Sequence, residues 1–444
     1  MKRLIETIKN IYKIEDLRFR IITTLGLILI YRMGSFIVLP GVNPENLQAL
    51  KAQASDGLLG FFNMFSGGAF SNASIFALGI MPYISASIVI QLLGIAIPYF
   101  QRLQREGESG RKKINQITRY LTILITGIQA PTYIANLHAT LPPEAFVLKG
   151  TFFFVSSIVI LVSGTMFIMW LGERITDKGI GNGISLLIMI GIIARMPIAF
   201  AQEFVSRLEE QNGGLVMFLL EMVFLFLVFV AVILLVQGTR RIPVQYAKRI
   251  VGNKQYGGVR QYIPLKVNAA GVMPIIFAQA LMFIPLMFAS FEATSGIAVA
   301  FANFTGFWYN LTLAIMIILF TYFYTAITVN PTQMAEDMKK NGGFIPGVKP
   351  GKKTIEFLDS VMSKITLPGS IFLALVAIMP AFAMIAGVQS QFAQFYGGTS
   401  LLIMVGVVLD TLQQIESHLL MRHYDGLMKS GRIKGRAGAT AAAL

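Results

Sequence analysis

Apolar and polar positions alternate along the chain in blocks, so that ten long apolar runs are separated by shorter polar segments. Each run is near 20 residues long, which is the length a helix needs to cross about 30 Å of hydrocarbon. The expected spans are 19–39, 74–97, 117–137, 149–171, 184–205, 214–236, 269–290, 308–329, 367–388 and 399–419. The pattern predicts an all-α polytopic membrane protein with ten transmembrane helices.

Composition and charge support a membrane protein and orient it. Hydrophobic residues make up 55% of the chain and charged residues 13%, against about 25% charged in soluble domains. The net charge of +15 indicates either an anionic partner or the excess of Lys and Arg that orients membrane proteins. Of the 37 basic residues, 32 lie in, or within three residues of, alternate segments beginning with the N-terminal arm, and the opposite loops hold only Lys51, Lys149 and Arg207. Both termini are therefore expected on the cytoplasmic side, with Arg32 and Arg195 inside spans.

Several kinds of chemistry find no support in the residues. The chain has no cysteine, its three histidines are scattered, and it contains no Gly-rich phosphate loop with Lys and Ser or Thr. No nucleophile and base are paired in the pattern of an enzyme. We expect no catalysis, no metal and no cofactor. Basic residues precede the first span as in a signal peptide, but no small-residue cleavage site follows, so this span is expected to be retained.

A short motif is repeated in equivalent places. The letters GIMP begin at Gly79 in the second span, and GVMP begins at Gly271 in the second span of the last five. Five crossings per half make the halves inverted, and Pro and Gly predict a broken helix in each that lines a water-filled interior. The expected divisions are a cytoplasmic N-terminal arm 1–18, a first half 19–205, a second half 206–419 and a cytoplasmic tail 420–444.

An apolar segment before the first motif is too short to span. It runs GLLGFFNMFSGGAFSNAS and is stopped by Gly67 and Gly68. Two alternatives stay open for it: a half-helix at the membrane interface, or a re-entrant stopper inside the protein.

Two isoleucine pairs have helical spacing. Ile80 and Ile84 are four apart, as are Ile184 and Ile188, so each pair shares a helix face. Such residues commonly face lipid or neighbouring helices. A ring of them across a pore would instead form a constriction that sheds water and resists ions.

Two basic cytoplasmic loops are larger than orientation requires. The loop at 237–268 has seven basic and no acidic residues, and its alternating apolar and polar positions predict a β-hairpin. In the loop at 330–366, Asn330 is a candidate N-cap with Pro331 at the first helical position, and a second short helix is expected from about Thr354. Positive-inside bias alone explains the charge, or else a cytosolic partner with an acidic or phosphate surface does.

Several longer motifs carry a resemblance to a known family. They are FNMFSGGAFSNASIFALGIMPYISASIVIQLL, EGESGRKKINQITRY, GTMFIMWLGERITDKGIGNGIS, IPLKVNAAGVMP, YFYTAITVNP, GFIPGVKPG and GGTSLLI. Together, and in order from near Leu17 to about His418, they resemble the SecY/Sec61-alpha family of protein translocases. The resemblance implies two inverted pseudo-symmetric halves of five helices around an hourglass pore, with a re-entrant plug half-helix and a lateral gate between the second and seventh helices. It implies a protein-conducting channel that passes unfolded secretory polypeptides and releases apolar segments sideways into the bilayer.

The resemblance assigns roles to residues that match the family motifs. The plug corresponds to about 57–72. The pore ring comprises Ile80, Ile84, Ile184, Ile188, Ile276 and Ile403. The central plug residues are Phe61, Phe62, Asn63, Met64, Phe65, Ser66, Gly67 and Gly68. The lateral gate comprises Pro82, Ser85, Ser87, Gln91, Asn268, Pro274 and Gln279. The motor- or ribosome-binding residues are Arg240, Arg241, Lys248, Arg249, Lys254 and Lys349.

The same resemblance implies partners and a location. The expected partners are SecE and SecG in a heterotrimer, the SecA ATPase, the ribosome with its nascent chain through rRNA contacts, signal peptides, unfolded polypeptides and membrane lipid, with SecDF and YidC as accessory proteins. The expected location is the bacterial inner membrane, and the driving energy comes from the motor or the ribosome. Many relatives have Arg in the motif Pro-Gly-x-Arg-Pro-Gly, where this chain has Lys349, which keeps the charge but loses the bidentate fork.

Two other functions are alternatives to the channel. A secondary transporter of a small solute also suits inverted halves and broken helices, and its candidate charges are Arg32, Arg195, Glu221 and Asp410. Each of these charges also fits a position near a helix end or a structural pair. An intramembrane enzyme is disfavoured because Asp410 and Glu416 are six apart, too far round a helix to act as an acid pair.

Overall fold

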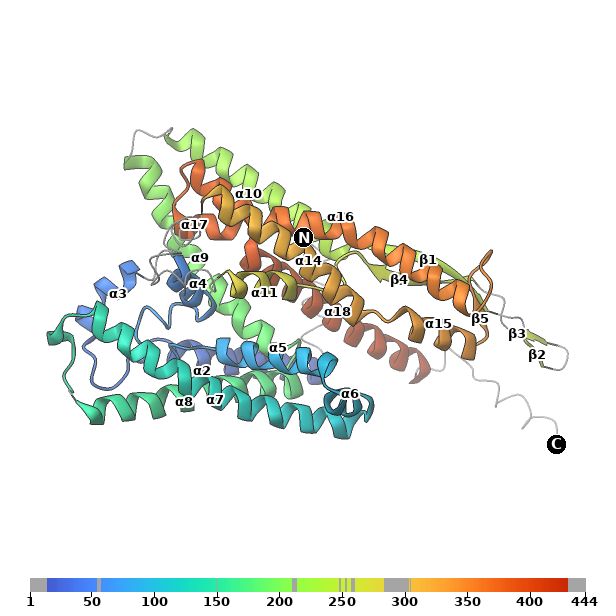
Figure 1. Ribbon diagram of the computed structural model, residues 1–444, viewed down its shortest axis with the longest axis horizontal. Coiled ribbons are helices and arrows are strands. Elements are labelled where there is room, and N and C mark those ends of the chain that lie inside the picture. Colours follow the sequence, from blue (N-terminus) through green and yellow to red (C-terminus); the bar gives the residue numbers. More distant parts are fainter. Residues whose placement is uncertain are drawn as a thin grey trace. The chain divides into compact units, whose positions relative to one another are not determined.

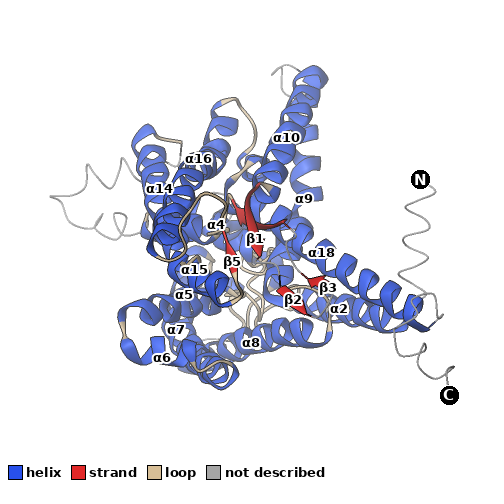
Figure 2. Cartoon of the chain, turned by 90° about the vertical axis from the view of Figure 1, so that its right-hand side faces the viewer, coloured by secondary structure: helices blue, strands red, loops and turns tan. Residues whose placement is uncertain are grey.

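The computed structural model describes residues 14–53, 57–148, 150–209, 214–246, 249–251, 254–256, 260–282, 303 and 305–429. Helices make up most of the described chain, and the strands are few and short (Figure 2). The fold divides into two compact units, Met1–Arg195 with Val407–Leu444 and Met196–Gly406. The divisions fall inside two long helices, α9 (Gly183–Glu209) and α18 (Gly398–Lys429).

The first unit is a helical bundle (Figure 1). Helices α5 and α6 pack against α7, α7 packs against α8, and α2 packs against α8. Its core lies along α7 and α8, where Ile134 and Leu161 are fully buried. Besides the beginning of α9 and most of α18, its elements are α2 (Glu15–Gly34), η1 (Pro44–Asn46), α3 (Gln48–Gln53), α4 (Gly57–Phe65), α5 (Met81–Ala96), α6 (Pro98–Arg105), α7 (Glu108–Thr140), η2 (Pro143–Ala145) and α8 (Thr151–Lys178).

The second unit combines long helices with a small sheet. Helix α14 packs along both α16 and α11. The elements that lie wholly in this unit are α10 (Gly214–Gln237), β1 (Thr239–Tyr246), β2 (Arg249–Val251), β3 (Lys254–Tyr256), β4 (Arg260–Lys266), α11 (Met273–Leu281), α14 (Phe307–Thr328), α15 (Pro331–Lys340), β5 (Gly343–Phe344), α16 (Lys352–Ile385), α17 (Ser390–Ala393) and η5 (Gln394–Tyr396).

The predicted β-hairpin is confirmed. Strand β1 pairs antiparallel with β4 from Thr239 opposite Lys266 to Gln245 opposite Arg260, and β5 joins the other edge of β1. The alternating pattern gives β1 one buried face, as predicted: Ile242 and Val244 are buried, while their neighbours on β1 are exposed or half-buried. Strands β2 and β3 form a separate antiparallel pair.

The hairpin packs on the helices of the second basic loop. Ile242 and Val244 share one apolar cluster with Met338 of α15 and Leu358 and Met362 of α16. The predicted cap of α15 is confirmed, since the Asn330 side chain accepts hydrogen bonds from the backbone N–H groups of residues 332 and 333 at 3.1 and 3.3 Å. The two basic loops therefore form one structured body.

The prediction of a second short helix from about Thr354 is corrected, because no separate helix begins there. Thr354 lies at the start of α16, which is a single helix of 34 residues that includes the span predicted at 367–388. No Gly or Pro interrupts the sequence from Lys352 to Leu367, so the amphipathic helix continues directly into the apolar run. Pro368 and Pro380 both lie inside the helix without ending it.

Six segments of the described chain are helical, long and apolar enough to cross a membrane, and the bent pair α5–α6 would make a seventh. The six are α8, α9, α10, α14 with the short α15 that follows it, α16 and α18. Helices α2 and α7 occupy the spans predicted at 19–39 and 117–137. The span predicted at 269–290 begins with α11 and then leaves the described residues. The chain is a mostly helical, multi-pass membrane protein, and the count of ten spans stays a prediction.

Candidate functional site

The repeated motif has the same local structure in both places, but it does not break a helix. Gly79 and Gly271 have φ of 56° and 66°, in the left-handed region that favours glycine. Helix α5 begins two residues after the first glycine, and α11 begins two residues after the second. Pro82 and Pro274 occupy the second helical position, where no intrahelical N–H bond is lost. The prediction of an interrupted helix is corrected: each motif starts a helix.

The six isoleucines predicted for the pore ring occupy similar positions within their own helices, near the N-terminal end of each helix. They lie at or within the first two turns of α5, α9, α11 and α18. Four are buried, with relative exposures of 8% or less, and the other two are partly buried. The buried ones are Ile80, Ile84, Ile188 and Ile403, and the partly buried ones are Ile184 and Ile276.

Local hydrogen bonds fix the beginning of α9, which carries Ile184 and Ile188. The side-chain oxygen of Asn182 accepts from the backbone N–H of Ile184 at 3.1 Å, which caps the helix. The N–H of Gly181 donates to the side chain of Gln414 in α18 at 2.8 Å. The motif GNGIS therefore builds a rigid helix start and holds Ile184 at a defined place.

The segment predicted as the plug, about 57–72 and called the plug segment below, forms a half-helix followed by a tight turn. Helix α4 ends at Phe65, and Gly67 and Gly68 have φ of 64° and 90°, so the predicted stop at these glycines is confirmed. The side-chain oxygen of Asn63 accepts from the N–H of Ser71 at 3.1 Å, which closes the turn on the end of the helix. Met64 is 5% exposed, which favours a segment covered by protein over one lying at the interface.

The turn after α4 lies against both predicted ring helices of the first unit. A Cβ atom added at Gly79, the residue before Ile80, would lie 3.3 Å from the Cβ of Ser66. A Cβ added at Gly67 would lie 2.7 Å from the Cα of Gly191, one turn beyond Ile188. The end of the plug segment thus contacts the starts of α5 and α9 at backbone distance.

The residues predicted for the lateral gate lie on α5, on α11 and in the turn that follows β4. Pro82, Ser85, Ser87 and Gln91 lie in α5, where the Gln91 side chain donates to the Ser87 hydroxyl at 3.4 Å. In the second unit, Pro274 and Gln279 lie in α11, and Asn268 lies in the turn that follows β4. The side-chain oxygens of Asn268 and Gln279 are buried, and neither has a hydrogen-bond partner within the described residues.

The basic residues predicted to bind a motor or ribosome lie at the loops. Arg240 and Arg241 are exposed on β1, and Lys349 is exposed in the turn before α16. Arg249 and Lys254 lie on β2 and β3, and Lys248 lies outside the described residues. The strand pair β2–β3 lies beyond the end of β1 and β4 in Figure 1.

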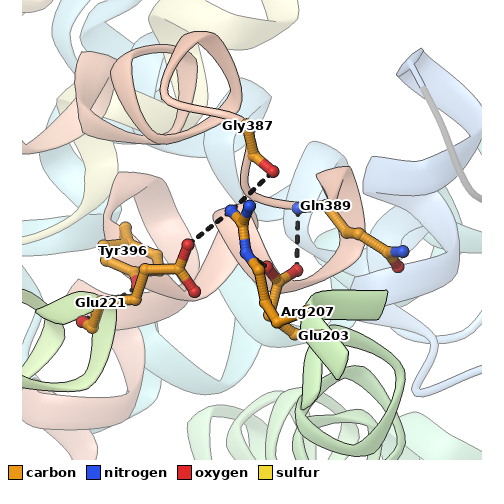
Figure 3. Close-up of polar contacts among 6 residues, drawn as sticks. All are labelled: Glu203, Arg207, Glu221, Gly387, Gln389 and Tyr396. Carbon is orange, nitrogen blue, oxygen red and sulfur yellow. Dashed lines mark hydrogen bonds and ion pairs between the residues drawn. The ribbon is translucent and has the colours of Figure 1, made fainter. Parts of the chain in front are cut away.

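A buried ionic cluster that was not predicted from the sequence lies in the second unit (Figure 3). Arg207 donates through Nε to Glu203 at 2.9 Å and through Nη2 to Glu221 at 2.5 Å. The same Nη2 donates to the Gly387 carbonyl at 2.7 Å, and the other Glu203 oxygen accepts from the Gln389 N–H at 2.9 Å. The three charged side chains are no more than 5% exposed.

This cluster corrects the placement of Arg207 in a loop. Arg207 lies in the last turn of α9, and it joins α9 to α10 and to the segment after α16. The hydroxyl of Tyr396 adds a hydrogen bond to the backbone carbonyl of Glu221 at 3.0 Å. The signal that could have revealed the cluster is the i, i+4 spacing of Glu203 and Arg207 in an otherwise apolar segment.

Similarity to known proteins agrees with this geometry. The family model SecY matches residues 74–412. The chain is 43% identical over 435 residues to the protein translocase subunit SecY of Mycobacterium tuberculosis, covering 93% of this chain and 97% of that protein. It is 42% identical to the protein translocase subunit SecY of Thermotoga maritima, covering 97% and 99%.

Solved structures show the same fold at low sequence identity. A structure described as that of a protein conducting channel matches with a TM-score of 0.62 at 19% identity, covering 90% of this chain and 92% of that one. The structure of Sec61 in the canine ribosome–channel complex matches with a TM-score of 0.56 at 19% identity, with the same coverage. The extent of these matches, together with the predicted motifs in their helical places, establishes that this chain belongs to the SecY family.

Proposed function

We propose that this protein is the channel through which unfolded secretory polypeptides cross the membrane, and that it releases apolar segments sideways into the bilayer. The observation that carries the proposal is the common position of the six isoleucines at four helix starts, in a chain of the SecY family. A collar of such residues would close around a polypeptide without hydrogen-bonding to it, so the sequence of the client would not be read. An empty collar would also shed water and resist ions.

The plug segment supports the same proposal. Its turn lies against the helix starts that carry Ile80 and Ile188, as the distances at Gly79 and Gly191 indicate. A solved relative is described as having a plug domain that stabilises the closed state of the translocation channel and maintains a membrane seal. We infer that the segment from about 57 to 72 does the same in this chain.

The orientation and partners follow from charge. Both termini and the basic body formed by the hairpin, α15 and the start of α16 would face the cytoplasm of a bacterial cell, with the protein in the inner membrane. Exposed Arg240, Arg241 and Lys349 would bind the rRNA of a translating ribosome or the acidic surface of the SecA motor. Energy would come from these partners, and SecE and SecG would complete the heterotrimer.

The proposal is tested by replacing Ile84 and Ile188 together with glycine. Removing two buried collar side chains should widen and wet the constriction, and we expect a higher ion conductance in planar bilayers. The matched control replaces two exposed isoleucines, Ile128 of α7 (65% exposed) and Ile198 of α9 (61% exposed), with glycine. Equal conductance in both double variants would reject the collar.

A second measurement separates the channel from a solute transporter. Purified protein in vesicles should import an unfolded polypeptide when the motor and ATP are supplied. Uptake of a small solute without motor or ribosome, and no uptake of polypeptide, would refute the proposal.

A further inference from the structure

Arg32 lies in the last turn of α2 and contacts the turn that follows the plug half-helix. Its Nη1 donates to the carbonyl oxygen of Gly67 at 2.9 Å, and its guanidinium lies 5.3 Å from the ring centre of Phe36. Within the described ranges of the chain, no ion pair includes Arg32. The hydrogen bond to Gly67 is therefore its direct link to another part of the fold.

A charge in an apolar environment makes this contact strong. A hydrogen bond from a cation is shorter and about twice as strong as a neutral one. Arg32 is partly buried, so protein atoms exclude part of the water that would compete for its donors.

Two tyrosines hold neighbouring carbonyls of the same turn. The hydroxyl of Tyr31, next to Arg32 on α2, donates to the carbonyl of Ser66 at 3.3 Å. The hydroxyl of Tyr133 on α7 donates to the carbonyl of Phe70 at 2.9 Å. Three side chains from two helices thus bind backbone carbonyls between residues 66 and 70, whatever the side chains of the turn are.

The turn is also closely fitted at Gly67. A Cβ atom there would lie 2.8 Å from Nη1 of Arg32 and 2.7 Å from the Cα of Gly191. Space for a side chain is absent because the guanidinium and α9 approach the backbone from two sides. The contact of Arg32 is therefore one of several close contacts around this turn, which together form its seat.

We propose that Arg32 is a positioning residue that latches the plug, and that its bond to Gly67 sets how readily the segment leaves its seat. The proposal rests on the proposed function, in which this segment closes the pore. When the latch is broken, the half-helix should leave the starts of α5 and α9 more often, while the remaining helices keep their packing.

The competing explanation is that Arg32 only stabilises its own helix. A cation in the last turn of a helix interacts favourably with the helix dipole, and Arg32 has that position on α2. In that case its loss would weaken α2 and leave the plug where it is. A direct readout of the plug separates the two explanations.

The experiment uses the absence of cysteine from the chain. Met64 lies in α4 and is 5% exposed, so Met64→Cys places a buried thiol in the plug without background labelling. The full-length protein in membranes is labelled with a small maleimide, with and without Arg32→Gln. We expect labelling to become about tenfold faster, because hydrogen bonds to charged groups contribute at least that factor. The matched control is Arg20→Gln on the same helix, whose side chain contacts Asp16 and the Gly179 carbonyl.

Unchanged labelling in Arg32→Gln, or an equal increase in Arg20→Gln, would overturn the proposal. If Arg32→Gln does not accumulate in the membrane, Arg32→Lys and Tyr133→Phe replace it, because the first keeps the charge and the second removes a single hydroxyl. Both should accelerate labelling severalfold, and no acceleration in either would overturn the latch.

Ion conductance distinguishes the latch from the proposed function itself. Cysteine-free Arg32→Gln in planar bilayers should conduct more than the unmodified protein and more than Arg20→Gln. Faster labelling with unchanged conductance would leave the latch in place and refute the role of the plug as a seal.

Discussion

The buried ionic cluster around Arg207 gives a quantitative prediction for the change Arg207→Met. The replacement keeps an unbranched apolar stem but removes the whole guanidinium group and its charge, so it leaves Glu203 and Glu221 buried without their counter-ion. Breaking a buried ion pair by removing one partner costs about 3–5 kcal/mol. We expect the free energy of unfolding to fall by that amount.

The hydrogen bonds that Arg207 makes give a second estimate of this loss of stability. Arg207 donates to Glu203, to Glu221 and to the Gly387 carbonyl, and each net hydrogen bond to a charged group contributes about 1.5–3 kcal/mol. Their sum, about 5–9 kcal/mol, is an upper bound because one guanidinium makes all three bonds and its desolvation is shared. Arg207→Lys keeps the charge but lacks the planar fork, so it should lose part of this energy and be more stable than Arg207→Met.

The assay is reversible unfolding in mixed detergent micelles, followed by circular dichroism. The matched control is Arg119→Met, since Arg119 and Glu173 form a bidentate pair whose side chains are 46% and 26% exposed. Such an exposed pair contributes about 0–1 kcal/mol. A cysteine in place of Ala393, which is fully buried in α17 and lies in the sequence between Gln389 and Tyr396, reports whether opening is local.

A triple variant tests the electrostatic explanation. Arg207→Met with Glu203→Gln and Glu221→Gln has no buried charge, so it should be more stable than Arg207→Met alone. The electrostatic explanation is refuted if Arg207→Met loses no more stability than Arg119→Met, or if the triple variant is less stable than Arg207→Met alone.

Two further predictions concern the first unit and the basic body. Gly164→Ala in α8 should lower the free energy of unfolding by several kcal/mol, because its Cβ would lie 2.2 Å from the Ile75 carbonyl oxygen. Gly127→Ala in α7, with open space around it, should raise the free energy of unfolding by about 1 kcal/mol. Unfolding titrations of the two variants compare them directly, and a matching loss in both would contradict the packing argument. Replacing both Arg240 and Arg241 with alanine should weaken binding to the ribosome or motor, and the salt dependence of binding should fall by the equivalent of about two phosphate contacts. Binding titrations at several salt concentrations measure this, and an unchanged salt dependence would show that these residues are not in the interface.

The elements that the sequence predicted correctly are those specified by local signals. Alternating residues predicted the hairpin, because a strand with one buried face needs a period of two. Asn330 before Pro331 predicted the start of α15, since the cap and the fixed φ of proline act within four residues. Gly67 and Gly68 predicted the end of the half-helix for the same reason.

The elements that were predicted wrongly depend on how neighbouring signals combine. The motif at Gly79 was expected to break a helix, but its proline lies at a helix start, where it costs nothing. A short helix from about Thr354 was expected to be separate from the span at 367–388, yet α16 joins the two and continues through Pro368 and Pro380. A proline marks either the start or the interior of a helix, and only the preceding residues and the tertiary packing decide which.

The charges inside the apolar regions were the least predictable, and they bear on the choice of function. Arg207 was assigned to a loop from its spacing, whereas it is 5% exposed and engaged by two carboxylates that arrive from two different helices. Glu221, a candidate charge for a solute transporter, is used in the same cluster, and Asp410 is exposed on α18. Arg32 binds the backbone of the plug turn. Since a transporter of polar solutes needs such groups directed toward the solute, the engagement of Glu221 and Arg32 in the fold favours a channel, in which the proposed collar selects by apolar contact.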